Sequence, residues 1–185
     1  MSRTRKPSRG KKIKPTFFVF CEGKTEVQYI KFLKSQYRIP LVIDPTIKSI
    51  SINERYIRSY KKGRPIHKKD KTFLLYDLDV AGVHKKLSII KDVKLLVSNP
   101  CIELWFLLHL KEQNGVINCK KCNNDLDKKS NGYKKGVISI VLKEQLKKKQ
   151  LKAINRARKL KQFNNPSSTI YLLIDESEKI KKENL

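Results

Sequence analysis

Short apolar runs alternate with amphipathic segments along the first half of this chain. Four runs are rich in aromatic and β-branched residues and lack a helical period, which predicts buried strands over residues 17–21, 41–47, 71–78 and 93–97. The segments between them space apolar residues three or four apart, which predicts helices over 25–37, 52–62 and 81–91. This alternation favours an α/β fold with an open, mainly parallel sheet flanked by helices.

The pattern changes after the fourth predicted strand. Pro100 suits a first helical turn, and the apolar stretch 101–110 behind it predicts a helix buried on most sides. Polar residues over 111–136 predict a loop, and a Lys-rich stretch over 137–163 predicts helix with a break near Gln150, before a last helix over 169–182. The predicted organisation is a disordered basic arm (1–14), an α/β core (15–110), a polar loop (111–136) and a basic helical extension (137–185).

Charge separates this chain from an ordinary enzyme of its size. Its 185 residues carry 43 Lys and Arg against 17 Asp and Glu, a net charge of +26. Such an excess repels itself unless a polyanion neutralises it, and phosphate contacts release counterions, so nucleic acid is the favoured partner. The alternative is a Lys-rich composition that only fills solvated surfaces. The predicted nucleic-acid-binding residues are Lys24, Arg64, Lys68, Lys69, Lys148, Arg156 and Arg158.

The apolar runs also bear on location. None approaches the roughly eighteen residues of a membrane span, and Phe17–Phe20 is too short for a signal-peptide core. We therefore expect a cytoplasmic protein that does not contact a membrane.

Carboxylates stand where two of the predicted strands end. Glu22 follows the first strand, and Asp77 and Asp79 end the third. The carboxyl ends of parallel strands form the edge where α/β sheets hold ligands, and three carboxylates gathered there would bind Mg²⁺ or Mn²⁺. The alternative is structural, with Glu22 capping the next helix and the Asp pair ending a turn.

Three further features leave alternatives open, two beside Glu22 and one later in the chain. Glu26 fits dipole compensation at a helix start as well as support of a metal ion, and Lys24 fits a phosphate contact as well as a solvated side chain. Cys119 and Cys122 form half a zinc site that needs His109, a carboxylate or a second chain to complete it. We expect the metal on the carboxylates, not on the cysteines.

Three motifs together carry a family resemblance. They are Cys21-Glu22-Gly23-x-Thr25-Glu26, Asp77-x-Asp79, and the run from Ser98-Asn99-Pro100 through Glu103-Leu104-Trp105 to His109. The chain resembles the RloB-like family of the Toprim superfamily over nearly its whole length. The resemblance implies a Mg²⁺-dependent nuclease, or a nuclease-like effector, in bacterial anti-phage defence. It also implies a partner, because RloB-like proteins are usually encoded beside an AAA-type ATPase, and similar Toprim effectors in ATPase-gated anti-phage systems cleave RNA, tRNA included.

The resemblance also implies residue roles. Glu22 would be the catalytic acid or base and a metal ligand, Asp77 and Asp79 would hold the metal, and Glu103 would be a supporting catalytic acid. His109 fits a buried, hydrogen-bonded histidine at least as well as a proton-transfer role.

The expected function is therefore a divalent-metal-dependent nuclease acting on RNA or DNA. The rival is a non-catalytic nucleic-acid-binding subunit of an ATPase-containing defence complex, and a domain for primer synthesis is less favoured. The sequence leaves open the choice between RNA and DNA, a requirement for a trigger, and homo-oligomerisation.

Overall fold

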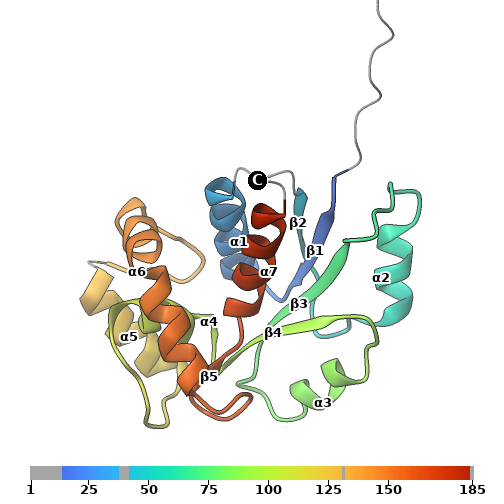
Figure 1. Ribbon diagram of the computed structural model, residues 1–185. Coiled ribbons are helices and arrows are strands. Elements are labelled where there is room, and N and C mark those ends of the chain that lie inside the picture. The colour runs from blue at the N-terminus through green and yellow to red at the C-terminus, as the bar shows by residue number, and fades with distance from the viewer. Residues whose placement is uncertain (1–13, 38–41, 131, 184–185) are drawn as a thin grey trace, which may run out of the picture.

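A five-stranded sheet forms the centre of the molecule (Figure 1). The structure is a computed structural model, and it describes residues 14–37, 42–130 and 132–183. The strand order is β2-β1-β3-β4-β5, with β1 to β4 parallel and β5 antiparallel to β4. The strands are β1 (Thr16–Cys21), β2 (Val42–Ile47), β3 (Lys71–Asp77), β4 (Lys94–Asn99) and β5 (Ser167–Ser168). The predicted α/β class with a mainly parallel sheet is confirmed, and the arrangement is compatible with a Toprim-like fold.

Helices cover both faces of the sheet (Figure 1). One face carries α1, α4 and α7, with α5 and α6 packed outside α4, and the other carries α2 and α3. The helices are α1 (Lys24–Gln36), α2 (Glu54–Lys61), α3 (Val83–Ser88), α4 (Ile102–Leu110), α5 (Cys119–Ser130), α6 (Ile140–Lys159) and α7 (Tyr171–Lys182). Across the described residues, the structure contains no helix with both the length and the apolar character that a bilayer crossing demands.

The apolar strand runs follow from this layering. In β1, Phe17 and Val19 join the core under α1 and α4, whereas Phe18 and Phe20 join the core under α2 and α3. Successive side chains of a strand point to opposite faces, so a strand covered on both sides needs an apolar residue at every position. β2 lies at the sheet edge, where Pro45 can lack an N–H without interrupting an inner ladder.

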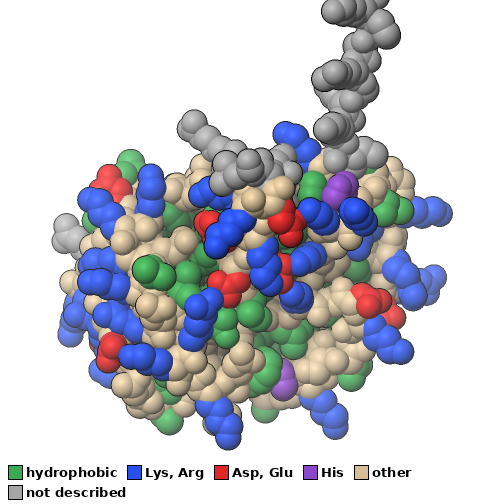
Figure 2. Space-filling model, viewed as in Figure 1, with side chains coloured by type: hydrophobic (Ala, Val, Ile, Leu, Met, Phe, Trp, Pro, Cys, Tyr) green, Lys and Arg blue, Asp and Glu red, His purple; other side chains and the backbone are tan. Residues whose placement is uncertain are grey.

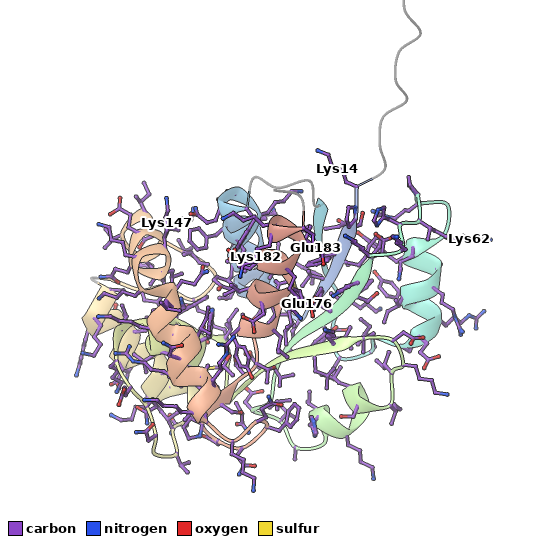
Figure 3. The ribbon with its side chains drawn as sticks, in the orientation of Figure 1. Lys14, Lys62, Lys147, Glu176, Lys182 and Glu183 are labelled. Carbon is purple, nitrogen blue, oxygen red and sulfur yellow. The ribbon has the colours of Figure 1, made fainter. Side chains whose placement is uncertain are left out.

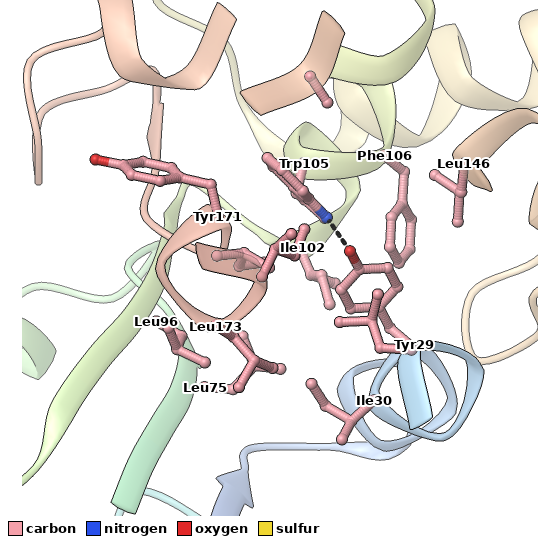
Figure 4. Close-up of a cluster of buried hydrophobic side chains, with 14 of the residues drawn as sticks. Tyr29, Ile30, Leu75, Leu96, Ile102, Trp105, Phe106, Leu146, Tyr171 and Leu173 are labelled. Atoms are coloured by element: carbon pink, nitrogen blue, oxygen red, sulfur yellow. Dashed lines mark hydrogen bonds between the residues drawn. The ribbon is translucent and has the colours of Figure 1, made fainter. Parts of the chain in front are cut away.

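Helix α4 is the centre of the larger core, as its apolar sequence predicted. Every residue from Ile102 to His109 is buried. The indole Nε1 of Trp105 donates a hydrogen bond to the Tyr29 hydroxyl over 2.7 Å, which ties α4 to α1 inside the core (Figure 4). A buried indole N–H needs such a partner, so this bond fixes the orientation of α4 against the sheet.

The second half of the chain differs from its sequence prediction in three ways. The polar loop predicted over 111–136 contains helix α5, whose Cys122, Leu126 and Ser130 lie buried at four-residue spacing. The break predicted near Gln150 is absent, because α6 runs unbroken through it. The segment over 137–185 is more than a helical extension, because β5 pairs with β4 and extends the sheet. The predicted basic arm, residues 1–14, lies outside the described residues except for Lys14.

Candidate carboxylate site

Two hydrogen bonds join the ends of β1, β3 and α4. The backbone N–H of Asp77 donates to Glu22 Oε2 over 2.9 Å, and the N–H of Ile102 donates to Asp77 Oδ1 over 2.9 Å. Glu22 is exposed and Asp77 is half-buried. The parallel sheet therefore brings these two predicted site residues together at its carboxyl edge.

The turn from β1 into α1 adds a carboxylate to the same place. Glu26 lies in the first turn of α1 and is buried. A Cβ atom at Gly23 would lie 3.1 Å from Glu26 Oε2, closer than almost all such contacts, so the glycine makes room for this carboxylate. Both readings of Glu26 fit the structure. Its carboxylate accepts backbone N–H bonds at the start of α1, from Gly23 and from Glu26 itself, and it also lies near enough to Glu103 and Glu22 for their charges to raise its pKa.

Glu103 is the most enclosed of the four carboxylates. It is fully buried at the start of α4, and its Oε1 accepts a hydrogen bond from the Tyr133 hydroxyl over 2.8 Å. Its Oε2 is buried and has no hydrogen-bond partner in the described part of the chain. A buried carboxylate oxygen without a donor is costly, and either a proton or a cation would relieve it.

The carboxylates change one another's protonation. Burial raises the pKa of Asp77 to about 9, and the charges of Glu26, Glu103 and Glu22 add to that rise. Burial also raises the pKa of Glu26, with the charges of Glu103 and Glu22 adding to it. In the absence of a counter-ion, Asp77 would therefore be protonated at neutral pH.

Lys135, which no sequence pattern indicated, lies close enough to these carboxylates to interact with their charges. Partial burial lowers the pKa of Lys135, but the charges of Glu103 and Asp77 outweigh it and raise the pKa overall. Burial and the charge of Glu103 likewise raise the pKa of Tyr133 above its usual range. Both residues lie in the segment between α5 and α6, some thirty positions from Glu103, so no local spacing in the sequence signals their contact.

The donor set suits a hard cation. Its ligand atoms would all be carboxylate oxygens, which Mg²⁺ and Mn²⁺ prefer, and the unpartnered Glu103 Oε2 and the raised pKa of Asp77 both favour added positive charge. As the side chains lie, however, no group of three or more His, Cys, Asp or Glu within residues 14–37, 42–130 and 132–183 is arranged to hold a metal ion. The hydrogen bonds that Glu22 and Asp77 accept from backbone N–H groups help to explain this.

Asp79 lies apart from the four clustered carboxylates. It is exposed, and the Cys119 thiol lies 3.8 Å from its Oδ2. It lines a pocket of about 420 Å³ with Asn99, Pro100 and Asn165 among its neighbours. The rule that residues two apart point the same way holds within a strand, and β3 ends at Asp77, so it does not extend to Asp79.

The neighbour of Cys119 and Cys122 is the thiol of Cys101, and not His109, which the sequence offered as a further zinc ligand. The neighbouring Cys122 thiol and burial raise the pKa of Cys101 far above its usual value, and the negative charge of Glu103 adds to the rise. His109 instead lies in the core, where its Nδ1 is 2.9 Å from the Trp105 carbonyl oxygen. Burial lowers the His109 pKa to about 4, so the ring is neutral at physiological pH.

The seven predicted nucleic-acid-binding residues are not gathered into one surface. Lys24 is exposed beside the carboxylates, at the start of α1. Arg64 pairs with Asp44 over 2.6 Å and Lys69 with Glu183 over 2.5 Å, and Lys68 is exposed in the same segment before β3. These three precede the amino end of β3, whereas Asp77 ends that strand.

The remaining three belong to α6. Lys148 is exposed, but Arg156 Nη1 donates to the Leu108 carbonyl oxygen over 2.7 Å, and Arg158 pairs with Asp175 over 2.8 Å. These two arginines therefore help to anchor α6. Positive charge is instead spread over the surface, where Lys and Arg side chains cover much of the visible face among few acidic ones (Figure 2).

Comparison with known proteins gives one match. The family model described as RloB-like protein matches residues 17–176, which takes in all five strands apart from Thr16 at the start of β1, the four clustered carboxylates and most of the described chain. Neither the search of curated proteins nor the search of solved structures finds a match. A family match over this much of the sequence settles membership, and the chain therefore belongs to the RloB-like family.

Proposed function

We propose that this protein is a divalent-metal-dependent nuclease that cleaves phosphodiester bonds in RNA or DNA. The observation that supports it best is the carboxylate cluster at the carboxyl edge of the sheet, where a buried Glu103 oxygen has no partner among the described residues. These carboxylates lie close enough to raise one another's pKa although the chain as a whole carries a net charge of +26, and a cation would relieve their repulsion.

The chain's own residues would divide the chemistry among them. Glu22, Asp77 and Glu103 would hold Mg²⁺ or Mn²⁺, which would neutralise the developing charge on the phosphoryl group. The Asp77 N–H holds Glu22 through Oε2, and this leaves Oε1 to accept or donate a proton as the general acid or base. Asp79 would have to turn from its place beside Cys119 towards Asp77 to serve as a further ligand. Lys24 and Lys135 would contact phosphate.

Family membership and the resemblance behind it also support a proposal about the biological role. We propose that the protein is a cytoplasmic effector of anti-phage defence that acts with an AAA-type ATPase. The four cysteines are all free thiols, which fits a reducing compartment.

A second function has its own supporting observations. Lys135 already neutralises part of the carboxylate charge, and no metal-holding group is arranged within the described residues. Both fit a non-catalytic subunit that binds nucleic acid through its surface charge.

A cleavage assay separates the two functions. A mixed pool of RNA and DNA is incubated with the protein in Mg²⁺ or in chelator, alone and with the partner ATPase. Products that form in Mg²⁺ and vanish in chelator support the nuclease. Binding without cleavage under every condition supports the non-catalytic subunit.

A further inference from the structure

A second pocket lies away from the carboxylate site. It has a volume of about 700 Å³ and is formed by α2, the segment that follows it and the turn at Lys91–Asp92. Thr72, the second residue of β3, lines it, whereas Asp77 is the last residue of that strand. The pocket therefore lies towards the amino end of β3, and the carboxylates lie at its carboxyl end.

Positive charge dominates the lining. Five cationic side chains face three acidic ones, and Arg58, Lys62 and Lys91 have no ion-pair partner among the described residues. Two of the acids are already engaged by backbone N–H groups. Glu54 accepts from Lys91 over 3.1 Å, and Asp70 accepts from Thr16 over 2.6 Å and from His67 over 2.9 Å. The unpaired cations are therefore available to an anion that enters the pocket.

Two further cations are held in place before any ligand arrives. Arg64 donates from Nε to the Tyr60 carbonyl oxygen over 3.1 Å, its guanidinium lies 4.4 Å from the centre of the Tyr60 ring, and its Nη1 pairs with Asp44, which neutralises its charge but holds it in place. Lys61 donates to the Thr72 hydroxyl over 3.1 Å. Fixed groups of this kind lower the ordering cost of binding.

The rest of the wall is apolar. Phe18 and Ile57 are buried beneath the pocket, and Pro65 and Ile66 stand at its edge, where Ile66 is 87% exposed. Pockets that take small organic ligands combine this size and apolar surface with a few placed polar groups. The partner with matching chemistry has an anionic part and a flat, weakly polar part.

We propose that this pocket binds a nucleotide. Arg58, Lys62 and Lys91 contact its phosphates, and its base or sugar lies against Pro65 and Ile66. A nucleic-acid strand is less favoured, because the pocket is removed from the carboxylates and its volume suits a small ligand. The site would sense a nucleotide at a distance from the place where cleavage is proposed.

Calorimetric titration of the full chain tests this assignment. The ligands are ATP, AMP, pyrophosphate and adenosine, in chelator so that no metal bridges the phosphates to the carboxylates. The pocket variant is Arg58→Gln with Lys62→Gln. The control is Lys147→Gln with Lys152→Gln on α6, which removes the same charge from exposed residues on the opposite side of the molecule, as Figure 3 shows for Lys62 and Lys147.

We expect ATP to bind the wild type and the control alike and the pocket variant at least tenfold more weakly. Ile66→Ser should weaken ATP binding at least threefold and leave pyrophosphate binding unchanged, and adenosine should bind least. Three results would overturn the proposal: no binding of ATP to the wild type, equal losses in pocket variant and control, or an RNA oligonucleotide that responds to the pocket variant while ATP does not bind. Asp77→Asn should keep ATP binding. A failure of ATP binding can therefore be distinguished from a failure of the proposed cleavage.

Discussion

The two ends of β3 differ in charge and in exposure. At its carboxyl end, four carboxylates lie close enough to raise the pKa values of Asp77 and Glu26, and Glu103 is fully buried. Towards its amino end, Arg58, Lys62 and Lys91 line an open pocket, and Arg58 and Lys62 are exposed to solvent. Exposed cations cost little, whereas clustered carboxylates destabilise the fold unless something neutralises them. The carboxylate end is therefore the place where substitutions should have the larger effects.

Glu22→Gln should have the largest effect. The amide oxygen can still accept the Asp77 N–H bond, so the fold should be intact, but the side chain can no longer take up a proton or bind a cation strongly. We expect the cleavage rate to fall by about 100-fold or more. Glu144→Gln, at an exposed position on α6, is the matched control. Equal rates for wild type and Glu22→Gln, measured on the same substrate, would remove Glu22 from the mechanism.

Metal exchange should separate the carboxylates from the cysteines. After treatment with chelator, Mg²⁺ or Mn²⁺ should restore cleavage and Zn²⁺ should not, because the donors at the site are carboxylate oxygens. Cys119→Ser should leave this recovery unchanged. One tightly bound zinc per chain that is lost in Cys119→Ser, detected by elemental analysis, would contradict the expectation and assign the metal to the thiols.

Nucleic-acid affinity should depend steeply on salt. Residues 1–14 carry seven Lys or Arg and no acid. Replacing those seven by Gln keeps the length and should lower affinity at low salt by about tenfold or more, with a shallower slope of log affinity against log salt. Fluorescence anisotropy at several salt concentrations measures both quantities. An affinity that does not change with salt would contradict the electrostatic argument.

Much of this architecture was predictable, because the apolar runs of β1 and β3 require a sheet covered on both faces. The meeting of Glu22 and Asp77 follows from parallel pairing of those strands. Helix α5 was missed because its apolar stripe is only Cys122 and Leu126 among polar neighbours. Tyr133 was missed because its contact with Glu103 depends on how α5 and α6 pack against α4, and no local pattern encodes that.

Asp77→Asn should stabilise the metal-free protein. The pKa of Asp77 is about 9 in the folded state, against an ordinary value of 3.8 for an aspartate. Between those values the folded state holds a proton that the unfolded state releases, so the free energy of unfolding of the wild type falls as pH rises through this window. The variant has no carboxyl group at this position, so it does not lose stability in this way as pH rises. Its amide oxygen can still accept the Ile102 N–H bond.

The advantage of Asp77→Asn should therefore be absent below about pH 4 and grow towards pH 9. In chelator at pH 8 we expect its Tm to be higher by about 4 °C, which corresponds to ~1–2 kcal/mol for a chain of this size. Thermal unfolding followed by circular dichroism measures it. A Tm below that of the wild type at pH 8 would mean that Asp77 is charged and stabilising in the metal-free fold.

Lys135→Met should have the smallest effect and report on the same balance of charge. The charges of Glu103 and Asp77 raise the pKa of Lys135, but Lys135 is exposed and solvent screens this attraction, so its loss should lower the Tm in chelator by only about 1 °C. Without that competing cation, the carboxylates should bind Mg²⁺ more tightly, by about threefold. A Mg²⁺ titration followed by Tm measures both effects, with Lys134→Met as the control at the exposed neighbouring position. If Mg²⁺ raises the Tm of wild type, Lys135→Met and Asp77→Asn by the same amount, the ion does not bind among these carboxylates, and the charge at this end of the sheet is balanced by the protein alone.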